Sequence, residues 1–236
     1  MAVPVKHRSQ LSGLPLGRHG NPLATTERSM VKQERAARTR ETLIRSAAEV
    51  FDREGFSRAS LTAISSLAGV SNGALHFHFA SKAALADVVE ATALTKLLAL
   101  THTQPPAGKA SHVQLVVDVT HRLAHALRDD VVLRTGFALG GEPSRPVRVG
   151  LREHWRCWVA QALERAEAEG ELRTEVAPQD VVTAVVAATA GFEVLGVRDA
   201  MWLSATTVSR FWRLLLPAVA PAALLTGLQA GGTRPQ

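Results

Sequence analysis

The sequence predicts an all-α protein, in which a small helix-turn-helix domain precedes a larger helical domain. Apolar residues recur at helical spacing from about residue 35 onward. Two short helical segments flank the glycine-containing turn 69–71, and this arrangement is typical of a helix-turn-helix. The β-branched cluster at 181–186 is compatible with a buried strand. Its spacing and the lack of a partner strand favour a helix.

Four parts are expected along the chain. Residues 1–33 have no sustained period and are rich in Pro, Gly, Ser, Thr and basic residues, so we expect a flexible basic extension. The helix-turn-helix domain is expected over 34–82 and the larger helical domain over 83–218. Residues 219–236 form a C-terminal tail, which we expect to be frayed from Gly227.

The first three helices are predicted from spacing and capping residues. A helix over about 35–54 ends at Gly55, and its apolar residues recur at helical spacing. Ser60 is placed to cap a second helix that runs to Ala68. After the turn, Ser71 caps a third helix. We expect three of the residues that follow to lock this third helix into the core: Leu75, Phe77 and Phe79.

The larger domain is predicted as a series of further helices. Ser81 caps the first of them. After a break at 104–108, the next helix carries Val116, Val119, Leu123 and Leu127 on one face. A short helix is expected over 131–139, and a longer one from about 146 to 169, before Gly170. The last two helices are expected after Pro178 and from about Val208 to Pro217, where the proline ends the helix.

The net positive charge lies at one end of the chain. The 236 residues include 27 Lys or Arg and 21 Asp or Glu, for a formal net charge of +6. The first 40 residues hold eight basic and two acidic residues, so the remainder carries no net charge. Such asymmetry favours a polyanionic partner at the N-terminal end. The alternative is a solvated basic tail.

Composition excludes several other classes of protein. A hydrophobic fraction of 46% excludes a wholly disordered chain. The single cysteine, Cys157, excludes an internal disulfide and fits a reducing cytoplasm. The apolar run 214–225 is short and contains two prolines, and the first fifteen residues hold no apolar stretch of signal-peptide length. We therefore expect a cytoplasmic protein with no membrane partner.

The segment from Ala59 to Lys82, together with Arg38-Thr39-Arg40 and the stretch 51–56, resembles the DNA-binding domain of TetR-family repressors. The stretch 73–79 is similar, more narrowly, to the γ-butyrolactone receptors of actinobacteria. Those receptors usually have Tyr where this chain has His76, and the whole chain contains no Tyr. The resemblance implies a homodimeric repressor without a metal or other cofactor. It implies binding to double-stranded, near-palindromic operator DNA and release by a small hydrophobic effector of the γ-butyrolactone, butenolide or furan type.

The motif also indicates which residues contact DNA. The N-terminal ends of helices offer free N–H groups to phosphates, and a recognition helix reads base edges in the major groove. Asn is suited to adenine, while Gly and Ala permit close approach. The alternative for Gly73 is close packing and for His78 a structural role. The predicted DNA contacts are Arg38, Thr39, Arg40, Ser60, Thr62, Ser71, Asn72, Gly73, Ala74, His76, His78 and Lys82.

The larger domain is expected to hold an effector pocket and a dimer interface. By resemblance Trp155 lines the pocket, and its flat ring suits an apolar ligand with one polar end. Ordinary core packing is the alternative. The secondary pocket candidates are Arg134, Arg152 and Phe192. The predicted interface residues on the last two helices are Val208, Phe211, Trp212 and Leu215.

Other functions have weaker support. His121 and His125 have the spacing of a two-histidine metal site, but Arg122 stands where a zinc protease requires Glu. Cys157 is interpreted as a buried small residue rather than a redox thiol. No nucleophile elbow, phosphate loop or dinucleotide fingerprint appears, so we do not expect an enzyme. The main alternative is an orphan regulator that binds DNA but no such signal.

Overall fold

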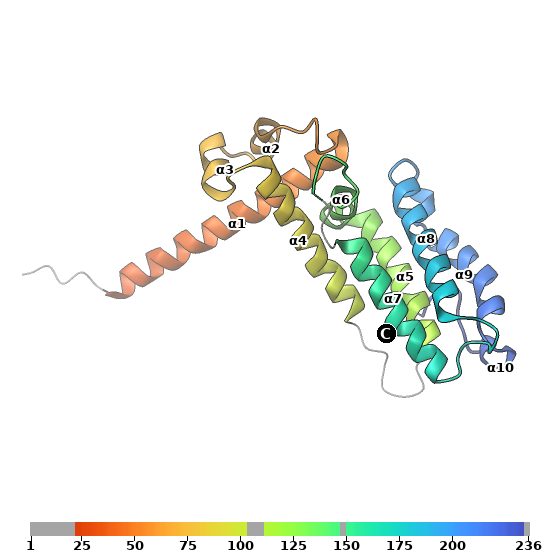
Figure 1. The fold of residues 1–236 in the computed structure, drawn as a ribbon. Coiled ribbons are helices and arrows are strands. Elements are labelled where there is room, and N and C mark those ends of the chain that lie inside the picture. The colour runs from red at the N-terminus through yellow and green to blue at the C-terminus, as the bar shows by residue number, and fades with distance from the viewer. Residues whose placement is uncertain (1–21, 103–110, 147–149, 234–236) are drawn as a thin grey trace, which may run out of the picture. The chain divides into compact units, whose positions relative to one another are not determined.

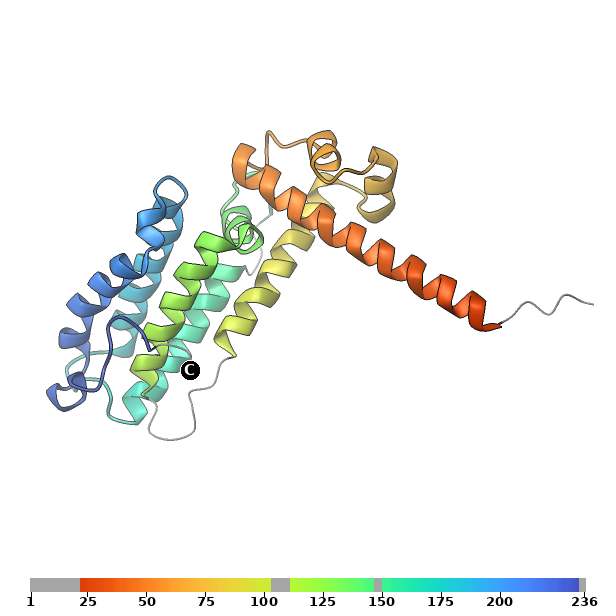
Figure 2. The same cartoon turned by 180° about the vertical axis from the view of Figure 1, so that it is seen from behind.

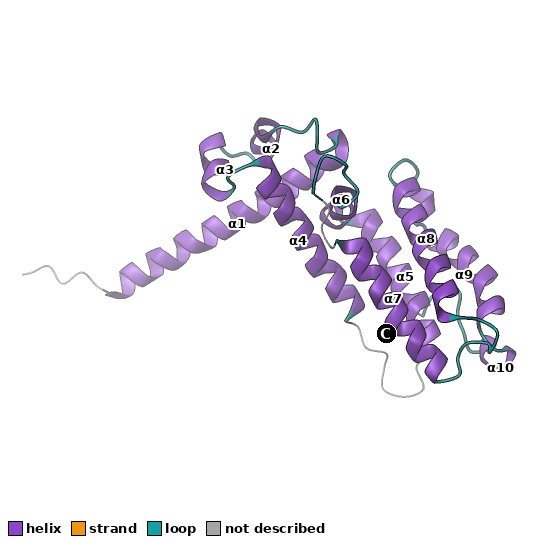
Figure 3. Ribbon diagram, in the orientation of Figure 1, coloured by secondary structure: helices purple, strands orange, loops and turns teal. Residues whose placement is uncertain are grey.

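The computed structural model describes residues 22–102, 111–146 and 150–233, except for the side chains of residues 22–29 and 31. Every regular element in these ranges is a helix, which confirms the predicted all-α class (Figures 1 and 3). The elements are α1 (Pro22–Glu54), α2 (Leu61–Leu67), α3 (Asn72–His78), α4 (Lys82–Thr101), α5 (His112–Asp129), α6 (Val131–Leu139), α7 (Leu151–Ala168), α8 (Pro178–Gly196), the 3₁₀ turn η1 (Ala200–Leu203), α9 (Ala205–Val219) and α10 (Ala222–Leu225). The predicted break at 104–108 lies outside the described residues.

Helix α1 begins earlier than predicted. It starts at Pro22, whereas apolar spacing placed the start near residue 35. Proline suits the first turn of a helix because its missing N–H has no intrahelical acceptor there. The chain divides after Thr39 into two units, and α1 runs across the division. Residues 1–21, the rest of the predicted extension, lie outside the described residues.

The first hydrophobic core joins the second half of α1 to α2, α3 and the start of α4. From α1 it buries Leu43, Ile44, Ala47, Ala48 and Phe51, as their spacing predicted. The other helices contribute Ile64, Leu75, Leu85 and Val89, and Phe79 follows α3. Two residues of α6, Val132 and Leu139, belong to the same core. Helix α6 therefore shares this core, where it packs against α4.

The second core is formed by α5, α7, α8 and α9 together with the end of α4. Helix α5 contacts each of the other three, and Figures 1 and 2 show α7 and α9 on its two flanks. The four predicted inward residues of α5 are all buried: Val116, Val119, Leu123 and Leu127. The cluster 181–186 is helical, which confirms the choice of helix over strand.

Helix α6 crosses α4 at close range and is bonded to its neighbours. A Cβ on Gly136 would collide with the Cβ of Ala93, so glycine permits this crossing. Asp130 caps α6 and accepts from Lys96 Nζ at 2.6 Å. Burial alone would raise the pKa of Asp130, but the bonds from Lys96 and from two backbone N–H groups lower it overall. The corner between α5 and α6 is therefore fixed to α4.

The C-terminal part differs from the prediction in two ways. Pro217 lies inside α9, which continues to Val219 rather than ending at the proline. Proline removes one hydrogen bond near the end of the helix, and the burial of Leu216 and Val219 in the core outweighs this loss.

The segment 227–233 is docked rather than frayed. Gln114 of α5 exchanges two hydrogen bonds with the backbone of Gln229, at 2.7 and 3.1 Å. His121 Nε2 lies 3.0 Å from the carbonyl oxygen of Ala230, and Asp118 accepts from the N–H and the hydroxyl of Thr233. Three successive turns of α5 therefore hold this segment.

Helix α8 is the one helix among the described residues that is long and apolar enough to cross a membrane by composition. Its inward residues Val181, Val182 and Val185 are buried in the second core. A core helix of a soluble protein passes the same test, so α8 is weak evidence for a membrane span.

Candidate DNA-binding surface and effector cavity

The helix-turn-helix is held by three serine caps, as the sequence predicted. Ser60 Oγ accepts from the N–H of Ala63, Ser71 Oγ from Ala74, and each distance is 3.1 Å. Ser81 caps α4 in the same way. Gly69 has a φ of +67°, a conformation that side chains disfavour, and it provides the turn between α2 and α3.

Helix α3 presents a mixed polar and aromatic face to solvent. Asn72, Gly73 and His76 are exposed, and Ala74 and His78 are half-buried. From α2 and the caps, Ser60, Thr62 and Ser71 are also exposed.

One prediction for α3 is wrong. Leu75 and Phe79 are buried as expected, but Phe77 is 82% exposed. Phe77 is two residues from Leu75, about 200° around the helix, so it lies opposite the buried face. The ring of His78 contacts it edge-on, with centroids 5.2 Å apart. An exposed aromatic therefore lies beside the predicted base-contacting residues.

Asn72 is already engaged within the protein. The buried Ser65 hydroxyl donates to Asn72 Oδ1 at 2.6 Å. A bidentate contact to adenine requires that same oxygen as an acceptor. An amide oxygen has two lone pairs, so Asn72 Oδ1 can keep the Ser65 bond and still accept from a base, and the Ser65 bond orients the amide.

The predicted contacts in the middle of α1 are mostly exposed. Arg38 pairs with Glu34 at 2.8 Å, and the Thr39 hydroxyl donates to the carbonyl oxygen of Arg35. Within the second unit, the guanidinium of Arg40 lies 5.5 Å from the ring centroid of Phe79. Arg40 is exposed, so its charge is accessible to a phosphate.

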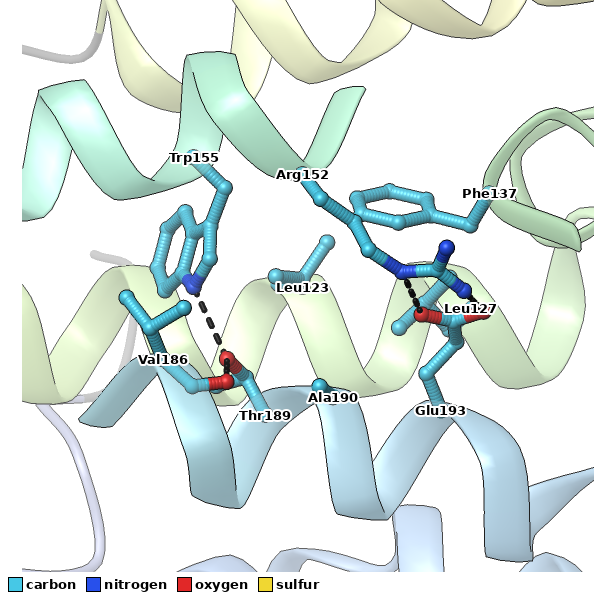
Figure 4. Close-up of a pocket in the computed structure, with 9 residues that line it drawn as sticks. All are labelled: Leu123, Leu127, Phe137, Arg152, Trp155, Val186, Thr189, Ala190 and Glu193. Carbon is cyan, nitrogen blue, oxygen red and sulfur yellow. Dashed lines mark hydrogen bonds and ion pairs between the residues drawn. The ribbon is translucent and has the colours of Figure 1, made fainter. Parts of the chain in front are cut away.

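A cavity of about 30 Å³ lies in the larger domain among α5, α6, α7 and α8 (Figure 4). Its walls are mainly apolar. The apolar lining residues are Leu123, Leu127, Phe137, Trp155, Val186 and Ala190. Trp155 is 2% exposed, and its ring stacks on that of Trp158 at 5.3 Å.

Polar groups occur at two places on the cavity wall. Trp155 Nε1 donates to Thr189 Oγ1 at 2.9 Å. Arg152 of α7 forms two hydrogen bonds to Glu193 of α8, Nε to Oε2 at 3.1 Å and Nη2 to Oε1 at 2.7 Å. Figure 4 shows these two groups on separate parts of the wall, with apolar side chains between them. The cavity therefore offers an apolar surface with a neutral donor and an ion pair.

Two of the predicted pocket residues lie elsewhere. Arg134 pairs with Asp52 of α1 at 2.9 Å and donates to the carbonyl oxygens of Leu127 and Arg128. Phe192 is buried toward α9, where its ring centroid lies 5.9 Å from that of Phe211. It occupies a different face of α8 from the residues that line the cavity. Arg152 and Trp155 do line the cavity.

A family model described as bacterial regulatory proteins of the tetR family matches residues 43–89. The chain is also 30% identical over 207 residues to the A-factor receptor protein of Streptomyces griseus. The matched region covers 86% of this chain and 71% of that relative. The chain belongs to the TetR family. Within this family it is a γ-butyrolactone receptor-like regulator.

Solved structures agree with this assignment. CprB of Streptomyces coelicolor, in complex with its biological operator sequence, has a TM-score of 0.69 and 27% identity, covering 82% of this regulator and 94% of that chain. A γ-butyrolactone receptor described as ArpA-like has a TM-score of 0.69 and 28% identity, covering 80% and 92%. The regulator TylP of Streptomyces fradiae has a TM-score of 0.62 and 32% identity, covering 83% and 93%.

Lys82 of this TetR-family regulator has internal partners that the sequence did not reveal. Its ammonium donates to the carbonyl oxygens of Phe56 at 2.8 Å, Ser57 at 3.1 Å and Ala59 at 2.9 Å. An ammonium has three N–H donors, so these carbonyls use all of them. Lys82 therefore joins the start of α4 to the turn between α1 and α2, and a phosphate contact requires one of these bonds to break.

Replacing Lys82 with methionine is expected to lower the stability of the regulator, because three carbonyl oxygens lose a charged donor. Hydrogen bonds to charged groups contribute about 1.5–3 kcal/mol, so a clear fall in melting temperature follows. The slope of log affinity against log salt should stay at the wild-type value. Arg40→Ala is the control, because loss of one phosphate contact flattens that slope by about one unit. If the K82M protein keeps the wild-type melting temperature and its salt slope is flatter, Lys82 contacts a DNA phosphate, as the sequence predicted.

The structure corrects two of the predicted interface residues. Val208 and Trp212 are 0% and 1% exposed, because they face the regulator's own core. Phe211 and Leu215 are partly buried against that core. Leu214, between them, is 82% exposed. Leu214 therefore lies on the outward face of α9, whereas the four predicted residues face the core wholly or in part.

The two histidines considered as metal ligands and the single cysteine have other partners within the protein. His121 contacts the docked C-terminal segment, and His125 pairs with Asp129 at 2.8 Å. The described residues contain no group of three potential metal ligands. Cys157 is half-buried rather than buried, and a hydrogen bond to Glu153 raises the pKa of its thiol. A raised pKa disfavours the reactive thiolate.

The two polar cavity residues that the sequence analysis missed, Thr189 and Glu193, had a signal in the sequence. Glu193 is the one charged residue between Asp180 and Arg198, in an otherwise apolar helix. An isolated acid in such a segment requires a buried partner, which Arg152 provides. Thr189 lies one turn earlier on the same face. Helical spacing from Glu193 would have identified both.

Proposed function

We propose that this protein is a homodimeric, ligand-responsive repressor, which leaves its operator when a small hydrophobic signal binds. The observation that carries the proposal is the position of α6. Phe137 of α6 lines the cavity, while Thr135 of the same helix donates to the carbonyl oxygen of Ala48 in α1 at 3.0 Å. Arg134 adds the ion pair with Asp52 of α1. A displacement of α6 by ligand therefore acts directly on the helix that supports the DNA-binding surface.

The small size of the cavity supports a conformational response. Ligand pockets for drug-sized molecules have volumes of about 300–1,000 Å³, so a cavity of about 30 Å³ must expand to take a signal molecule. Expansion separates helices that are packed in the empty form. A ligand that binds only the expanded conformer shifts the population toward it. The apolar walls and Trp155 favour a γ-butyrolactone, a butenolide or a furan, and related receptors carry the γ-butyrolactone name.

The exposed face of α3 supports operator recognition in the cytoplasm. Asn72, Gly73 and His76 are exposed there together with Phe77. Amide and imidazole groups recognise base edges, and an exposed aromatic ring suits contact with thymine methyl groups. The similarity to CprB, which has been solved with its operator, supports the same use of this face.

Replacing Phe77 with alanine is expected to weaken operator binding without destabilising the fold. The side chain is 82% exposed, and surface substitutions usually change stability by less than about 0.5 kcal/mol. Phe79→Ala is the matched control, because Phe79 is 4% exposed and its loss costs about 3–5 kcal/mol. Thermal melting and fluorescence anisotropy with labelled operator measure the two effects. Wild-type affinity in a folded F77A protein would remove Phe77 from the DNA-binding surface.

The outward faces of α8 and α9 support the homodimer. Val194 and Leu195 of α8 and Leu214 of α9 are exposed, and Met201 and Trp202 of η1 are exposed beside them in sequence. Exposed apolar patches on soluble proteins commonly mark interaction sites. A second copy that pairs α8 and α9 in a four-helix bundle would cover these residues.

The proposal is tested by operator release in two tryptophan variants. Trp155→Phe removes the N–H group that bonds Thr189 and part of the aromatic wall of the cavity. It should raise the effector concentration needed for release by about tenfold, because about 1.4 kcal/mol of apolar contact with the effector is lost. Trp158→Phe is the control, because Trp158 Nε1 donates to the carbonyl oxygen of Thr101, and Trp158 is not among the cavity-lining residues. Gel shifts with α-alkyl γ-butyrolactones, butenolides and furans measure release. If none of them releases the wild-type protein, an orphan regulator replaces this proposal.

A further inference from the structure

The ion pair of Arg152 and Glu193 places one positive and one negative charge on one part of the cavity wall. Both residues line the cavity, and Figure 4 shows the guanidinium and the carboxylate facing each other from α7 and α8. The side chain of Glu193 is 7% exposed and that of Arg152 is 40% exposed. Two hydrogen bonds, at 2.7 and 3.1 Å, fix the pair in a bidentate geometry. The anion is therefore buried and the cation extends toward solvent.

The two charges neutralise each other, and the rest of the described lining carries none. The other polar lining residue, Thr189, is neutral and already accepts from Trp155 Nε1. A neutral ligand can enter without leaving an ion unpaired. A ligand carboxylate can reach Arg152 through the N–H groups that Glu193 does not use, but the two carboxylates then share one cation. That arrangement leaves a net negative charge beside the buried Glu193, and a ligand that instead removed Arg152 would leave Glu193 buried and unpaired. Both arrangements are unfavourable.

We propose that the Arg152–Glu193 pair is a charge filter, which admits a closed γ-lactone and excludes its ring-opened hydroxycarboxylate. This inference rests on the proposed function and adds the residues that determine specificity. Hydrolysis breaks the acyl C–O bond of the lactone and adds water. The products are an alcohol on the former ring oxygen, a carboxylate on the former carbonyl carbon, and one released proton. The alkyl side chain is unchanged, and the two forms differ in the opened ring, the new hydroxyl and the negative charge.

The Arg152–Glu193 pair also lies next to the loop that follows α6. A Cβ on Gly141 would lie 2.8 Å from Arg152 Nη1, so the loop after α6 passes close to the guanidinium. A ligand that displaced Arg152 from Glu193 would therefore disturb that loop. A neutral lactone leaves the pair intact. The filter further implies that a lactone-hydrolysing reaction ends the signal, because its product no longer fits the cavity.

The first test compares the two forms of one compound on the wild-type protein. The probes are α-hexyl-γ-butyrolactone and the hydroxycarboxylate salt made from it by alkaline hydrolysis, both measured at neutral pH. Quenching of tryptophan fluorescence and isothermal titration calorimetry report binding. The lactone is expected to bind about 100-fold more tightly than the salt, since placing like charges together is strongly unfavourable. Equal affinity for the two forms would overturn the filter while leaving the proposed function intact.

A lactone that neither binds nor releases operator would instead contradict the proposed function. In that case the charge filter is contradicted as well, because it requires the lactone to bind. The two failures are therefore distinguishable from the wild-type data alone, before any variant is prepared.

The second test changes the charge of the pair. Glu193→Gln keeps the shape of the side chain and removes its charge, so Arg152 becomes available to a ligand carboxylate. The hydroxycarboxylate should gain affinity by about tenfold or more relative to the lactone. Glu171→Gln is the matched control, because Glu171 is another buried acid, 8% exposed, that caps α5 through the N–H groups of His112 and Val113.

The E171Q protein should keep the wild-type preference for the lactone. An E193Q protein with an unchanged ratio of affinities shows that the pair only joins α7 to α8, which overturns the filter. Circular dichroism melting checks that both variants are folded. If E193Q does not fold, Glu193→Asp replaces it. This variant keeps the negative charge, so it should retain the preference for the lactone, and loss of that preference contradicts the proposal.

Discussion

Replacing Leu214 with arginine is expected to convert the proposed dimer to a monomer and to reduce operator affinity by about 100-fold or more, because two linked DNA-binding units gain affinity from each other. Leu214 lies on the outward face of α9 and is 82% exposed in the single chain. In a four-helix interface it faces its counterpart across a two-fold axis. The exposed Arg210 lies one turn earlier on the same face, so two further arginines there would bring more like charges together.

Light scattering and gel shifts measure the two effects of Leu214→Arg. The melting curve should keep its cooperativity, because Leu214 is not part of the core of the chain. Leu67→Arg is the control for oligomeric state, since Leu67 is also exposed, at 46%, but belongs to α2. A dimeric L214R protein would exclude the face centred on Leu214 and direct attention to the exposed residues of α8 and η1.

Local signals predicted the helix-turn-helix well. Serines before short apolar segments identified the caps at Ser60, Ser71 and Ser81, because a cap requires only the next three residues. Gly69 and the turn followed for the same reason. The bounds of α6, residues 131–139, were predicted correctly because Asp130 and Gly140 flank it. These features depend on neighbours in the sequence and not on the tertiary fold.

Errors arose where tertiary contacts decide the outcome. Lys82 looks like a free cation in the sequence, and only the fold brings the carbonyl oxygens of Phe56, Ser57 and Ala59 to it. Arg134 was a secondary pocket candidate, whereas its partner Asp52 is 82 residues away in sequence. Partners so distant in sequence leave no local pattern. Phe77 is different, because its helical phase already indicated exposure.

The cavity was predicted only in part. Trp155, which the sequence analysis assigned to a pocket, lines it, and the acid that lies on its wall was missed. Hydrophobic spacing locates core faces, but it does not distinguish a filled core from one with a cavity. The position of the cavity depends on how α5, α6, α7 and α8 pack, which the sequence of one helix does not contain.

Replacing Arg145 with methionine is expected to lower the free energy of unfolding by about 3–5 kcal/mol, the usual cost of breaking a buried ion pair. The Arg145 side chain is 6% exposed and pairs with both Asp87 and Glu90 of α4. Its guanidinium also lies 5.1 Å from the ring centroid of Phe56, in the turn that Lys82 holds. Methionine fills much of the space but leaves two acids without their shared cation.

The loop that carries Arg145 connects the two sites of the protein. At its start, Gly141 lies against Arg152 of the cavity. Further along, Ser144 donates to Glu142, a bond that lowers the pKa of Glu142, and the Ser57 hydroxyl lies 3.5 Å from the same carboxylate. The loop therefore contacts the cavity pair and the turn before α2. Loss of Arg145 should weaken the coupling between effector and operator as well as the fold.

Urea unfolding and effector-dependent gel shifts separate these two consequences of Arg145→Met. In addition to the loss of stability, the folded R145M protein should bind effector but release operator less completely. Arg156→Met is the matched control, since Arg156 pairs with Glu153 on the surface and both side chains are exposed. Exposed pairs contribute little, so this control should melt and respond like the wild type. If R145M retains full release at temperatures where it is folded, the loop stabilises the protein without transmitting the signal, and α6 alone connects the cavity to α1.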